Sequence, residues 1–375
     1  MSQSIYIIAG EVSGDTHGAC LMESLQELVP EVNFLGVGGP DMRRIGGENM
    51  TDWVEDAAVM GFVEVIKHYK WFKARFTEML KDAIAADPDV LVLIDYPGFN
   101  LRFADAIRQR LPAIKIVYYI SPQVWAWNKG RITKMAKTLD LMLCIFPFEK
   151  EIFESAGLRT VFTGHPLVDE LERKKENVVR SENLIGLFAG SREREVARLF
   201  PMMVETARRI HSHHPHVRFE AAAVSEKLEL VMREIIHAAK LPDSSIIALK
   251  IGNSHSLMQR ATCGAVASGT ATLEAAAFGM PYCLVYKVAW PTYILGKMLV
   301  KVKFIGLVNI LAGEKVVDEL IQADADSGHL EMCLTQLLTE VVDREKLSKK
   351  LLATAAMLGE LGAHRRAASG IATLL

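Results

Sequence analysis

The chain has 375 residues, half of them hydrophobic, and a formal net charge of −2. This length corresponds to about two domains, each with its own core, and the balanced charge excludes a global field that attracts nucleic acid. The cysteines form no C-x-x-C pair, which indicates buried reduced thiols. The N-terminus shows no signal-peptide pattern, and no apolar stretch is long enough to cross a bilayer, so we expect a cytoplasmic protein.

Short runs rich in valine and isoleucine alternate with longer amphipathic stretches. The predicted strands lie near 4–9, 33–37, 90–94, 115–120, 140–145, 184–188, 217–222, 245–249, 264–267 and 282–286. Apolar strands alternating with helices predict parallel sheets covered on both faces, an α/β class with two doubly wound domains. The polar stretch 170–183 separates a first domain, 1–170, from a second, 180–342. A helical tail, 343–375, is able to pack back on the first domain.

The loops after the strands carry most weight, because doubly wound sheets bind ligands at the carboxyl ends of their strands. The first such loop, AGEVSGDTHGA, is rich in glycine, but its spacing matches neither a dinucleotide fingerprint nor a P-loop. Its polar side chains, among them Glu11, Ser13 and His17, suit sugar hydroxyls. Its two carboxylates would repel a pyrophosphate, so we expect the nucleotide to bind elsewhere.

The stretch 64–84 has apolar residues at helical spacing, with Lys67, Lys70, Lys73 and Arg75 mostly off that stripe. Trp71 also lies off the stripe. An aromatic residue among basic ones on an exposed face predicts a helix at a membrane surface. An ordinary amphipathic helix with one exposed tryptophan is the alternative.

Asp95 follows the apolar strand VLVLI and precedes a Pro-Gly turn. A carboxylate at this edge can take a proton from an incoming hydroxyl, and partial burial would raise its pKa toward that role. The alternative is a cap on the following turn. Further along, Trp125 and Trp127 stand beside cations in SPQVWAWNKGR. This pattern predicts stacking on a sugar, a lipid interface, or a buried anchor for the loop.

The loop 187–196 has a plan suited to phosphate. Gly190 and Ser191 form a turn after a strand, and Arg192 can clamp a phosphate with its planar guanidinium. A surface arginine paired with a neighbouring glutamate is the alternative.

The loop 267–281 repeats this plan. Ser268, Gly269 and Thr270 lead into a helix whose free N–H groups would face a phosphate. Thr270 or Thr272 can add a hydroxyl, and Glu274 can accept both hydroxyls of a ribose. The alternative is an ordinary capped helix with a solvated Glu274.

Two further segments have less specific patterns. The run HSHHPH at 211–216 predicts the end of a surface helix, because a proline interrupts it and no cysteine or acidic pair accompanies it, so we predict no metal site. The apolar region 283–313 is broken by lysines. It predicts either a membrane-surface segment or a buried strand and helix.

Together, the motifs resemble those of one family, the lipid-A-disaccharide synthases, in order and over nearly the whole chain. They are AGEVSGDTHGA, GVGGPDM, MGFVEV, DYPGFN, SPQVWAW, FPFE, GHPL, GSREREV and SGTATLEAA. The resemblance implies a GT-B glycosyltransferase fold, with two Rossmann-like domains facing across a cleft. It implies transfer of 2,3-diacylglucosamine from UDP to the 6-hydroxyl of 2,3-diacylglucosamine 1-phosphate, with inversion. The products would be the β-1,6-linked disaccharide 1-phosphate and UDP, formed without a cofactor at the inner face of the inner membrane.

The resemblance also implies roles for particular residues. UDP is expected on the second domain, against Arg192 and the 268–274 loop, with Asn309 as a further contact near the donor. Asp95 is expected to be the base, with Glu11 and His17 at the reacting centre. The acceptor and lipid side would involve Ser13, Gly14, Trp71, Gln123, Trp125 and Trp127. Ala189 and Val308 depart from the family, which often has proline there. A homodimer is left open.

Two other functions fit the same fold. An isomerase similar to UDP-N-acetylglucosamine 2-epimerases would use the same UDP site but would not need lipid-facing segments. A nucleotide-sugar sensor would bind UDP without turnover. Release of UDP that depends on a lipid acceptor distinguishes the synthase from both.

Overall fold

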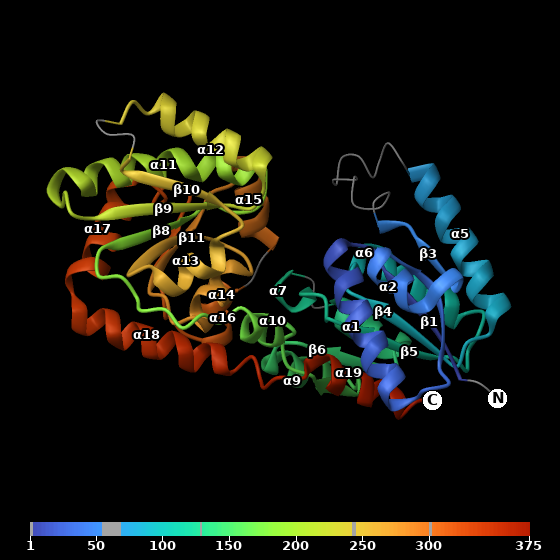
Figure 1. Cartoon of the computed structure of the whole chain (residues 1–375). Helices are drawn as coiled ribbons and strands as arrows, with labels where there is room; N and C mark the ends of the chain where they lie inside the picture. Colours follow the sequence, from blue (N-terminus) through green and yellow to red (C-terminus); the bar gives the residue numbers. More distant parts are fainter. Residues whose placement is uncertain (1–2, 55–68, 128–129, 242–244, 300–301) are drawn as a thin grey trace. The chain divides into compact units, whose positions relative to one another are not determined.

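The computed structural model describes residues 3–54, 69–127, 130–241, 245–299 and 302–375. The chain divides into two compact units: unit 1 is Met1–Asp169 with Leu358–Leu375, and unit 2 is Glu170–Met357. Each unit contains one parallel sheet with helices packed around it (Figure 1).

Unit 1 has a seven-stranded sheet of order β3-β2-β1-β4-β5-β6-β7. Its strands are β1 Ser4–Ala9, β2 Asn33–Gly38, β3 Met50–Asp52, β4 Val90–Ile94, β5 Lys115–Tyr119, β6 Leu141–Cys144 and β7 Thr160–Phe162. Its helices are α1 Val12–Leu28, α2 Pro40–Gly46, α5 Tyr69–Ala86, α6 Pro97–Arg108, α7 Val124–Trp127, α8 Gly130–Thr138, α9 Pro147–Glu154 and α19 Ala363–Ala372. The order reverses between β1 and β4, which is where doubly wound sheets bind ligands.

Unit 2 has a six-stranded sheet of order β10-β9-β8-β11-β12-β13. Its strands are β8 Leu184–Phe188, β9 Arg218–Ala223, β10 Ile247–Ile251, β11 Cys263–Ala267, β12 Tyr282–Tyr286 and β13 Glu319–Ile321. Its helices are α11 Glu193–His213, α12 Glu226–Ala238, α13 Ser254–Arg260, α14 Ala271–Ala277, α15 Trp290–Leu299, α16 Leu307–Ala312, α17 Ser327–Thr339 and α18 Val341–Ala356. Helix α10, Leu167–Arg173, crosses the boundary between the units. Strands β8 and β11 are wholly buried, as expected for a sheet covered on both faces.

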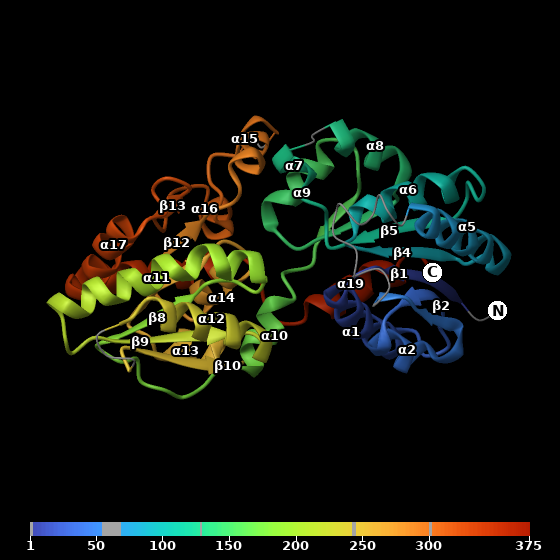
Figure 2. The ribbon, with the colours of Figure 1, turned by 90° about the horizontal axis from the view of Figure 1, so that it is seen from above.

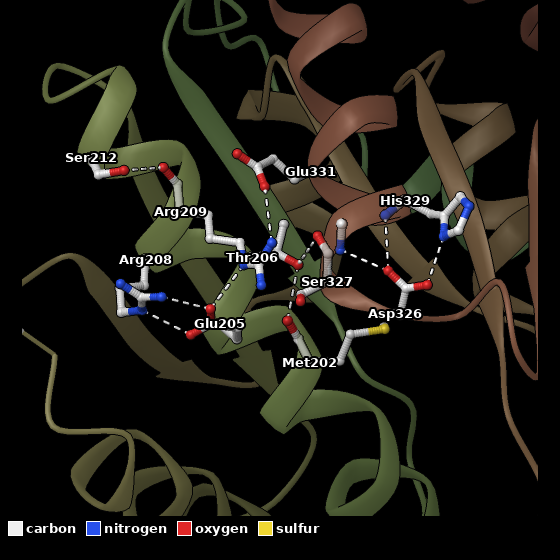
Figure 3. Close-up of polar contacts among 11 residues, drawn as sticks. Met202, Glu205, Thr206, Arg208, Arg209, Ser212, Asp326, Ser327, His329 and Glu331 are labelled. Atoms are coloured by element: carbon white, nitrogen blue, oxygen red, sulfur yellow. Dashed lines mark hydrogen bonds and ion pairs between the residues drawn. The ribbon is translucent and has the colours of Figure 1, made fainter.

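Helices α11 and α17 are joined by polar contacts as well as by the core of unit 2 (Figure 3). The Thr206 hydroxyl donates to the Ser327 carbonyl at 3.3 Å, and the Arg209 guanidinium lies 3.7 Å from the Glu331 carboxylate. Asp326 caps α17 by accepting from the N–H groups of the first turn. These contacts fix α11, whose N-cap is Arg192, the predicted phosphate-binding arginine.

The helical tail divides between the units. Helix α18 packs on α14, α16 and α17, and the Ser348 hydroxyl donates to the Gly279 carbonyl at 2.7 Å. Helix α19 packs on α1 of unit 1, and the Asp169 carboxylate accepts from the N–H groups of Gly362 and Ala363 at its start. Residues 358–375 therefore complete unit 1, while the preceding helix belongs to unit 2.

Each predicted strand overlaps an observed one, with β10 offset by two residues from the predicted 245–249, so the α/β prediction is confirmed. The short strands β3, β7 and β13 were not predicted. The glycine-rich stretch 9–19 was predicted to be a loop, which is wrong, because α1 begins at Val12. The first turns of α1 therefore carry the polar residues of that stretch.

Candidate active site

Asp95 lies directly after β4, at the carboxyl edge of the unit 1 sheet. Asp95 and Tyr96 both have positive φ, 44° and 48°, a conformation that costs a non-glycine residue on the order of 1 kcal/mol. The turn is held by the Asp95 N–H, which donates to the Tyr119 carbonyl at 3.0 Å. The Asp95 carbonyl accepts from the Tyr118 hydroxyl and, at 2.8 Å, from the Asn100 amide. The backbone is thus fixed, and the carboxylate is left at the sheet edge.

The electrostatics of Asp95 suit a proton acceptor. Burial raises the pKa of Asp95 to about 6, the nearby Glu11 carboxylate adds to the rise, and a hydrogen bond from the Tyr96 backbone opposes it. A carboxylate with a pKa near neutrality can both hold and release a proton at working pH. The burial expected from its position in the sequence is therefore found.

The segment after β1 lies against the Asp95 turn. A Cβ at Gly10 would lie 2.4 Å from Cδ1 of the Tyr96 ring, so only glycine fits here. Glu11 is the extended N-cap of α1, and Glu11 and Ser13 are exposed. Gly14 is buried in the first turn, where α1 passes close to Ala9.

Asp15, in the same stretch, has a structural role. It is buried, and its carboxylate accepts from the N–H groups of Gly39, Asp41 and Met42 at 2.8–3.0 Å. These groups form the start of α2, so Asp15 caps that helix. Asp15 is one of the two carboxylates that we expected to repel a pyrophosphate. Its oxygens are instead bonded to backbone N–H groups at the start of α2.

His17 belongs to α1 and lies against the C-terminal helix α19. Its ring centroid is 5.6 Å from that of His364 on α19. His165 is close by, and burial lowers the pKa of His165 to about 3, with the His17 ring adding to the effect. The structure thus places His17 in the contact between α1 and α19. Its role in the reaction stays a prediction.

Trp125 is a buried anchor for the loop, the third of the three roles that its pattern predicts, rather than a sugar or lipid contact. Its indole N–H donates to the Glu149 carboxylate at 2.9 Å. Glu149 is fully buried and also accepts from the Ser121 hydroxyl and, at 3.2 Å, from the Phe146 N–H. Burial raises the pKa of Glu149 to about 7, and these hydrogen bonds oppose the rise.

Glu149 was not singled out from the sequence, although the FPFE motif contains it. Its carboxylate fastens the SPQVW segment after β5 to the start of α9. Gln123, in the same segment, is exposed and available to a ligand. The side chain of Trp127 lies outside the described residues.

Trp71 belongs to an aromatic cluster beside Asp95, which corrects its assignment as an exposed tryptophan. Its ring stacks on that of Trp53, with centroids 6.4 Å apart and planes at 14°. Trp53 also contacts Tyr96 and Phe99, and its indole N–H donates to the Ala9 carbonyl at 2.6 Å. The cluster supports the Asp95 turn from α5. Lys67, predicted on the same helix, lies outside the described residues.

In unit 2, the turn after β8 carries a surface arginine paired with a neighbouring glutamate, which is the alternative named for it. Gly190 has φ 103°, and a Cβ there would lie 2.5 Å from the Glu195 carboxylate. Ser191 is exposed, and Arg192 is the N-cap of α11. The Arg192 side chain is 82% exposed and lies 3.1 Å from the Glu195 carboxylate. An anionic ligand can displace this exposed partner at little cost, because exposed ion pairs contribute only about 0–1 kcal/mol.

The second predicted phosphate loop follows β11. Ser268 is half-buried, Gly269 has φ 145° and Thr270 is exposed. Thr272 is wholly buried and its hydroxyl donates to the Gly269 carbonyl at 2.7 Å, so its expected contact with phosphate is replaced by a structural one. Glu274 is partly exposed, with its carboxylate 3.3 Å from Nε2 of His255.

Asn309, expected as a contact near the donor, is wholly buried, and its side chain is bonded within the fold. Its amide nitrogen donates to the Val317 carbonyl and the Glu319 carboxylate, and its oxygen accepts from the N–H groups of Val316 and Val317. These bonds shape the segment that precedes β13. The neighbouring Val308 is also buried.

The apolar region 283–313 contains a buried strand and an exposed helix. Strand β12 lies inside the sheet, whereas α15 leaves Trp290 61% and Ile294 54% exposed. None of the described helices is long and apolar enough to span a membrane. Strand β12 is thus the buried strand predicted for this region, while α15 has the exposed apolar side chains that the membrane-surface alternative requires.

The histidine run lies at the C-terminal end of α11, as predicted, and the rings of His214 and His216 are 6.1 Å apart. Over the described part of the chain, no group of three or more histidine, cysteine, aspartate and glutamate side chains could hold a metal ion.

Comparison with known proteins identifies the family. Residues 5–371 match the family described as lipid-A-disaccharide synthetase. The lipid-A-disaccharide synthase of Trichlorobacter lovleyi is 37% identical over 379 residues, covering 99% of this chain and 97% of that protein. The chain belongs to the lipid-A-disaccharide synthase family. It is a glycosyltransferase that forms the lipid A disaccharide.

Solved structures share the GT-B fold with this synthase at low identity. The UDP-GlcNAc 2-epimerase from Neisseria meningitidis bound to UDP-GlcNAc has a TM-score of 0.56 at 10% identity, covering 95% of this chain and 96% of that one. A protein from E. coli bound with UDP-2-fluoro glucose has a TM-score of 0.58 at 12% identity, covering 100% and 99%. The identity to an epimerase is far below that to a synthase, so the isomerase alternative is not favoured.

Proposed function

We propose that Asp95 is the general base of disaccharide formation. The observation that carries this assignment is the strained turn after β4, where a carboxylate with a pKa of about 6 stands at the switch point of the unit 1 sheet. Asp95 takes the proton of the acceptor 6-hydroxyl. In the same step the oxygen of that hydroxyl attacks the anomeric carbon of the donor. The bond from that carbon to the UDP phosphate breaks in the same step, so the configuration inverts.

The UDP moiety binds to unit 2 in this proposal. Arg192 is exposed at the start of α11, where it forms an ion pair with Glu195. When UDP binds, the Arg192 guanidinium leaves Glu195 and binds the diphosphate. Thr270 adds a hydroxyl, and Glu274 accepts hydrogen bonds from the ribose. A guanidinium that contacts the leaving diphosphate stabilises the charge that develops there.

The donor is UDP-2,3-diacylglucosamine and the acceptor is 2,3-diacylglucosamine 1-phosphate. On unit 1, Glu11, Ser13 and Gln123 are exposed at the sheet edge and bind sugar hydroxyls in this proposal. Both substrates carry acyl chains, so the enzyme works as a peripheral protein on the cytoplasmic face of the inner membrane. Trp290 and Ile294 on α15 support this location, because exposed aromatic and aliphatic side chains gain from interfacial burial.

The proposed reaction is tested by the acceptor dependence of UDP release. Purified protein is incubated with UDP-2,3-diacylglucosamine, with and without 2,3-diacylglucosamine 1-phosphate, and free UDP is measured. We expect release only with the lipid acceptor. Release with a soluble sugar as acceptor, or epimerisation at C2 of UDP-N-acetylglucosamine, would overturn the proposal.

A further inference from the structure

Helices α6 and α8 of unit 1 lie side by side (Figure 2). A pocket lies between them. Its volume is about 180 Å³, and residues from both helices line it. Leu101 and Met135 are apolar residues of its lining, and Arg102, Arg131 and Lys134 are basic ones. None of the functions assigned above uses this pocket.

The charge of the lining is positive. Asp105 is the one acidic residue among the lining residues, and its carboxylate forms an ion pair with Lys134 and accepts from the Thr138 hydroxyl at 3.0 Å. With three basic side chains and one acidic side chain, the formal charge of the lining is +2. Arg102 is exposed and forms no ion pair with any residue that the structure describes. A guanidinium in this setting binds a phosphate with two parallel hydrogen bonds.

The pocket begins next to the proposed base. Pro97 and Gly98, the first residues of α6, form part of its wall. Pro97 is two residues from Asp95, and two residues of backbone span at most about 7 Å. In a hexosamine 1-phosphate, the 6-hydroxyl and the phosphate lie on opposite sides of the ring oxygen. An acceptor whose phosphate lies in the pocket needs its sugar ring over Pro97 to bring its 6-hydroxyl to the carboxylate of Asp95.

We propose that the pocket between α6 and α8 binds the phosphate monoester of the acceptor, and that Arg102 determines specificity for the phosphorylated sugar. This inference rests on the proposed function, because it takes the acceptor from that reaction. It explains how the enzyme can distinguish acceptor from donor, since both carry the same acylated sugar but only the acceptor carries a phosphate monoester. An arginine whose charge is not neutralised by a neighbouring carboxylate favours the dianion.

The first test compares two acceptors in the full-length enzyme. Removing the 1-phosphate from the acceptor should raise the KM of the parent enzyme about tenfold, the usual effect of losing one charged hydrogen bond. Arg102→Ala should raise the KM for the phosphorylated acceptor by a similar factor and leave the KM for the unphosphorylated acceptor and for the donor unchanged. Arg110→Ala is the matched control, because Arg110 is exposed just beyond α6 and does not line the pocket. Equal effects of Arg102→Ala on both acceptors, or no effect, would overturn the proposal.

The second test does not depend on turnover. Binding of glucosamine 1-phosphate to the purified protein is followed by calorimetry in the parent and in Arg102→Glu, with thermal unfolding as the check on folding. We expect the variant to lose binding at least about tenfold. Unchanged binding would overturn the pocket assignment. If the parent forms no disaccharide yet binds glucosamine 1-phosphate through Arg102, the proposed reaction fails and the pocket stands.

Two further probes identify the source of the phosphate. Inorganic phosphate should bind more weakly than glucosamine 1-phosphate, because it leaves the sugar contacts unmade. Vesicles of anionic phospholipid should bind the parent and Arg102→Glu alike. A variant that loses vesicle binding but keeps glucosamine 1-phosphate binding would assign the pocket to lipid headgroups and overturn the proposal.

Discussion

The Tyr118 hydroxyl donates a hydrogen bond to the backbone carbonyl of Asp95. Tyr118 is fully buried, and burial, with the Asp95 charge adding to it, keeps the pKa of Tyr118 well above its usual range, so the ring stays a donor. The bond holds Asp95 in a left-handed conformation that costs stability. The fold of unit 1 thus holds the Asp95 carboxylate at a fixed place, although this backbone conformation lowers the stability of the protein.

Asp95→Asn should stabilise the protein at neutral pH. Burial raises the pKa of Asp95 to about 6 in the folded state, against about 3.9 in an unfolded chain. Below about pH 4 the carboxyl is protonated in both states and costs nothing. Between about pH 4 and 6 the unfolded chain ionises while the folded state keeps the proton, so about 2–3 kcal/mol of stability is lost by the time pH exceeds 6. Urea unfolding should therefore show the variant more stable than the parent at pH 7.5 and equal to it at pH 4.

Asp87→Asn controls for the backbone preference of asparagine, since Asp87 also has positive φ, 43°. An equal gain at both pH values would show that relief of backbone strain, rather than ionisation, is the cause.

Glu149→Ala should be strongly destabilising. It leaves the Ser121 hydroxyl, the Trp125 indole N–H and the Phe146 N–H without their shared acceptor in a buried place. The expected loss is about 3 kcal/mol, measured by urea unfolding, with a red shift of tryptophan fluorescence. Glu154→Ala, an exposed change at the end of the same helix, should cost less than about 0.5 kcal/mol. Equal stability of the two variants would show that Trp125 is anchored by packing alone.

Arg192→Ala and Glu274→Ala should each weaken UDP binding by about 1.5–3 kcal/mol, the range for hydrogen bonds to charged groups. Calorimetry with UDP measures this directly. Arg198→Ala, an exposed arginine further along α11, should leave the affinity unchanged. Unchanged affinity in both test variants would mean that the nucleotide does not bind to unit 2.

Replacing Trp290 and Ile294 together by serine should weaken sedimentation with anionic vesicles at low salt and leave UDP affinity unchanged. Both side chains are exposed on α15, so their loss removes apolar surface without opening a cavity. Met332→Ser removes a 63%-exposed apolar side chain from another helix of unit 2 and is the control. Trp71→Ser should instead lower the unfolding temperature, because Trp71 stacks on Trp53. A double variant that binds vesicles like the parent would remove α15 from the membrane contact.

Apolar runs predicted the long central strands, because strands buried on both faces have a continuous hydrophobic pattern. The edge strand β10 is mostly not buried, and its prediction was offset by two residues. The edge strands β3, β7 and β13 are three residues each, too short to show that pattern. The start of α1 was missed because Gly14 and Gly18 argue against a helix on propensity alone. In the structure they allow close packing, since a Cβ at Gly18 would lie 2.4 Å from Sδ of Met42.

The site residues that directly follow a strand could be predicted from the sequence, because the apolar strands are recognisable. Asp95 and Arg192 follow apolar strands, and both stand at sheet edges. Burial of single polar residues was not predictable, because Thr272 and Asn309 are satisfied by partners that only the fold brings together. Glu149 was missed for the same reason, since Ser121 and Trp125 lie more than twenty residues away in the chain.

The assignment of Asp95 as the base is tested most directly by transfer with Asp95→Asn. Parent and variant are incubated with UDP-2,3-diacylglucosamine and 2,3-diacylglucosamine 1-phosphate, and disaccharide and UDP are measured, with UDP affinity determined by calorimetry on the same preparations. The parent should form disaccharide 1-phosphate and UDP in equal amounts. The variant should bind UDP as the parent does and turn over at least about 10²-fold more slowly, the usual loss for a general base. A variant rate within about threefold of the parent, less than any general base contributes, would contradict the assignment.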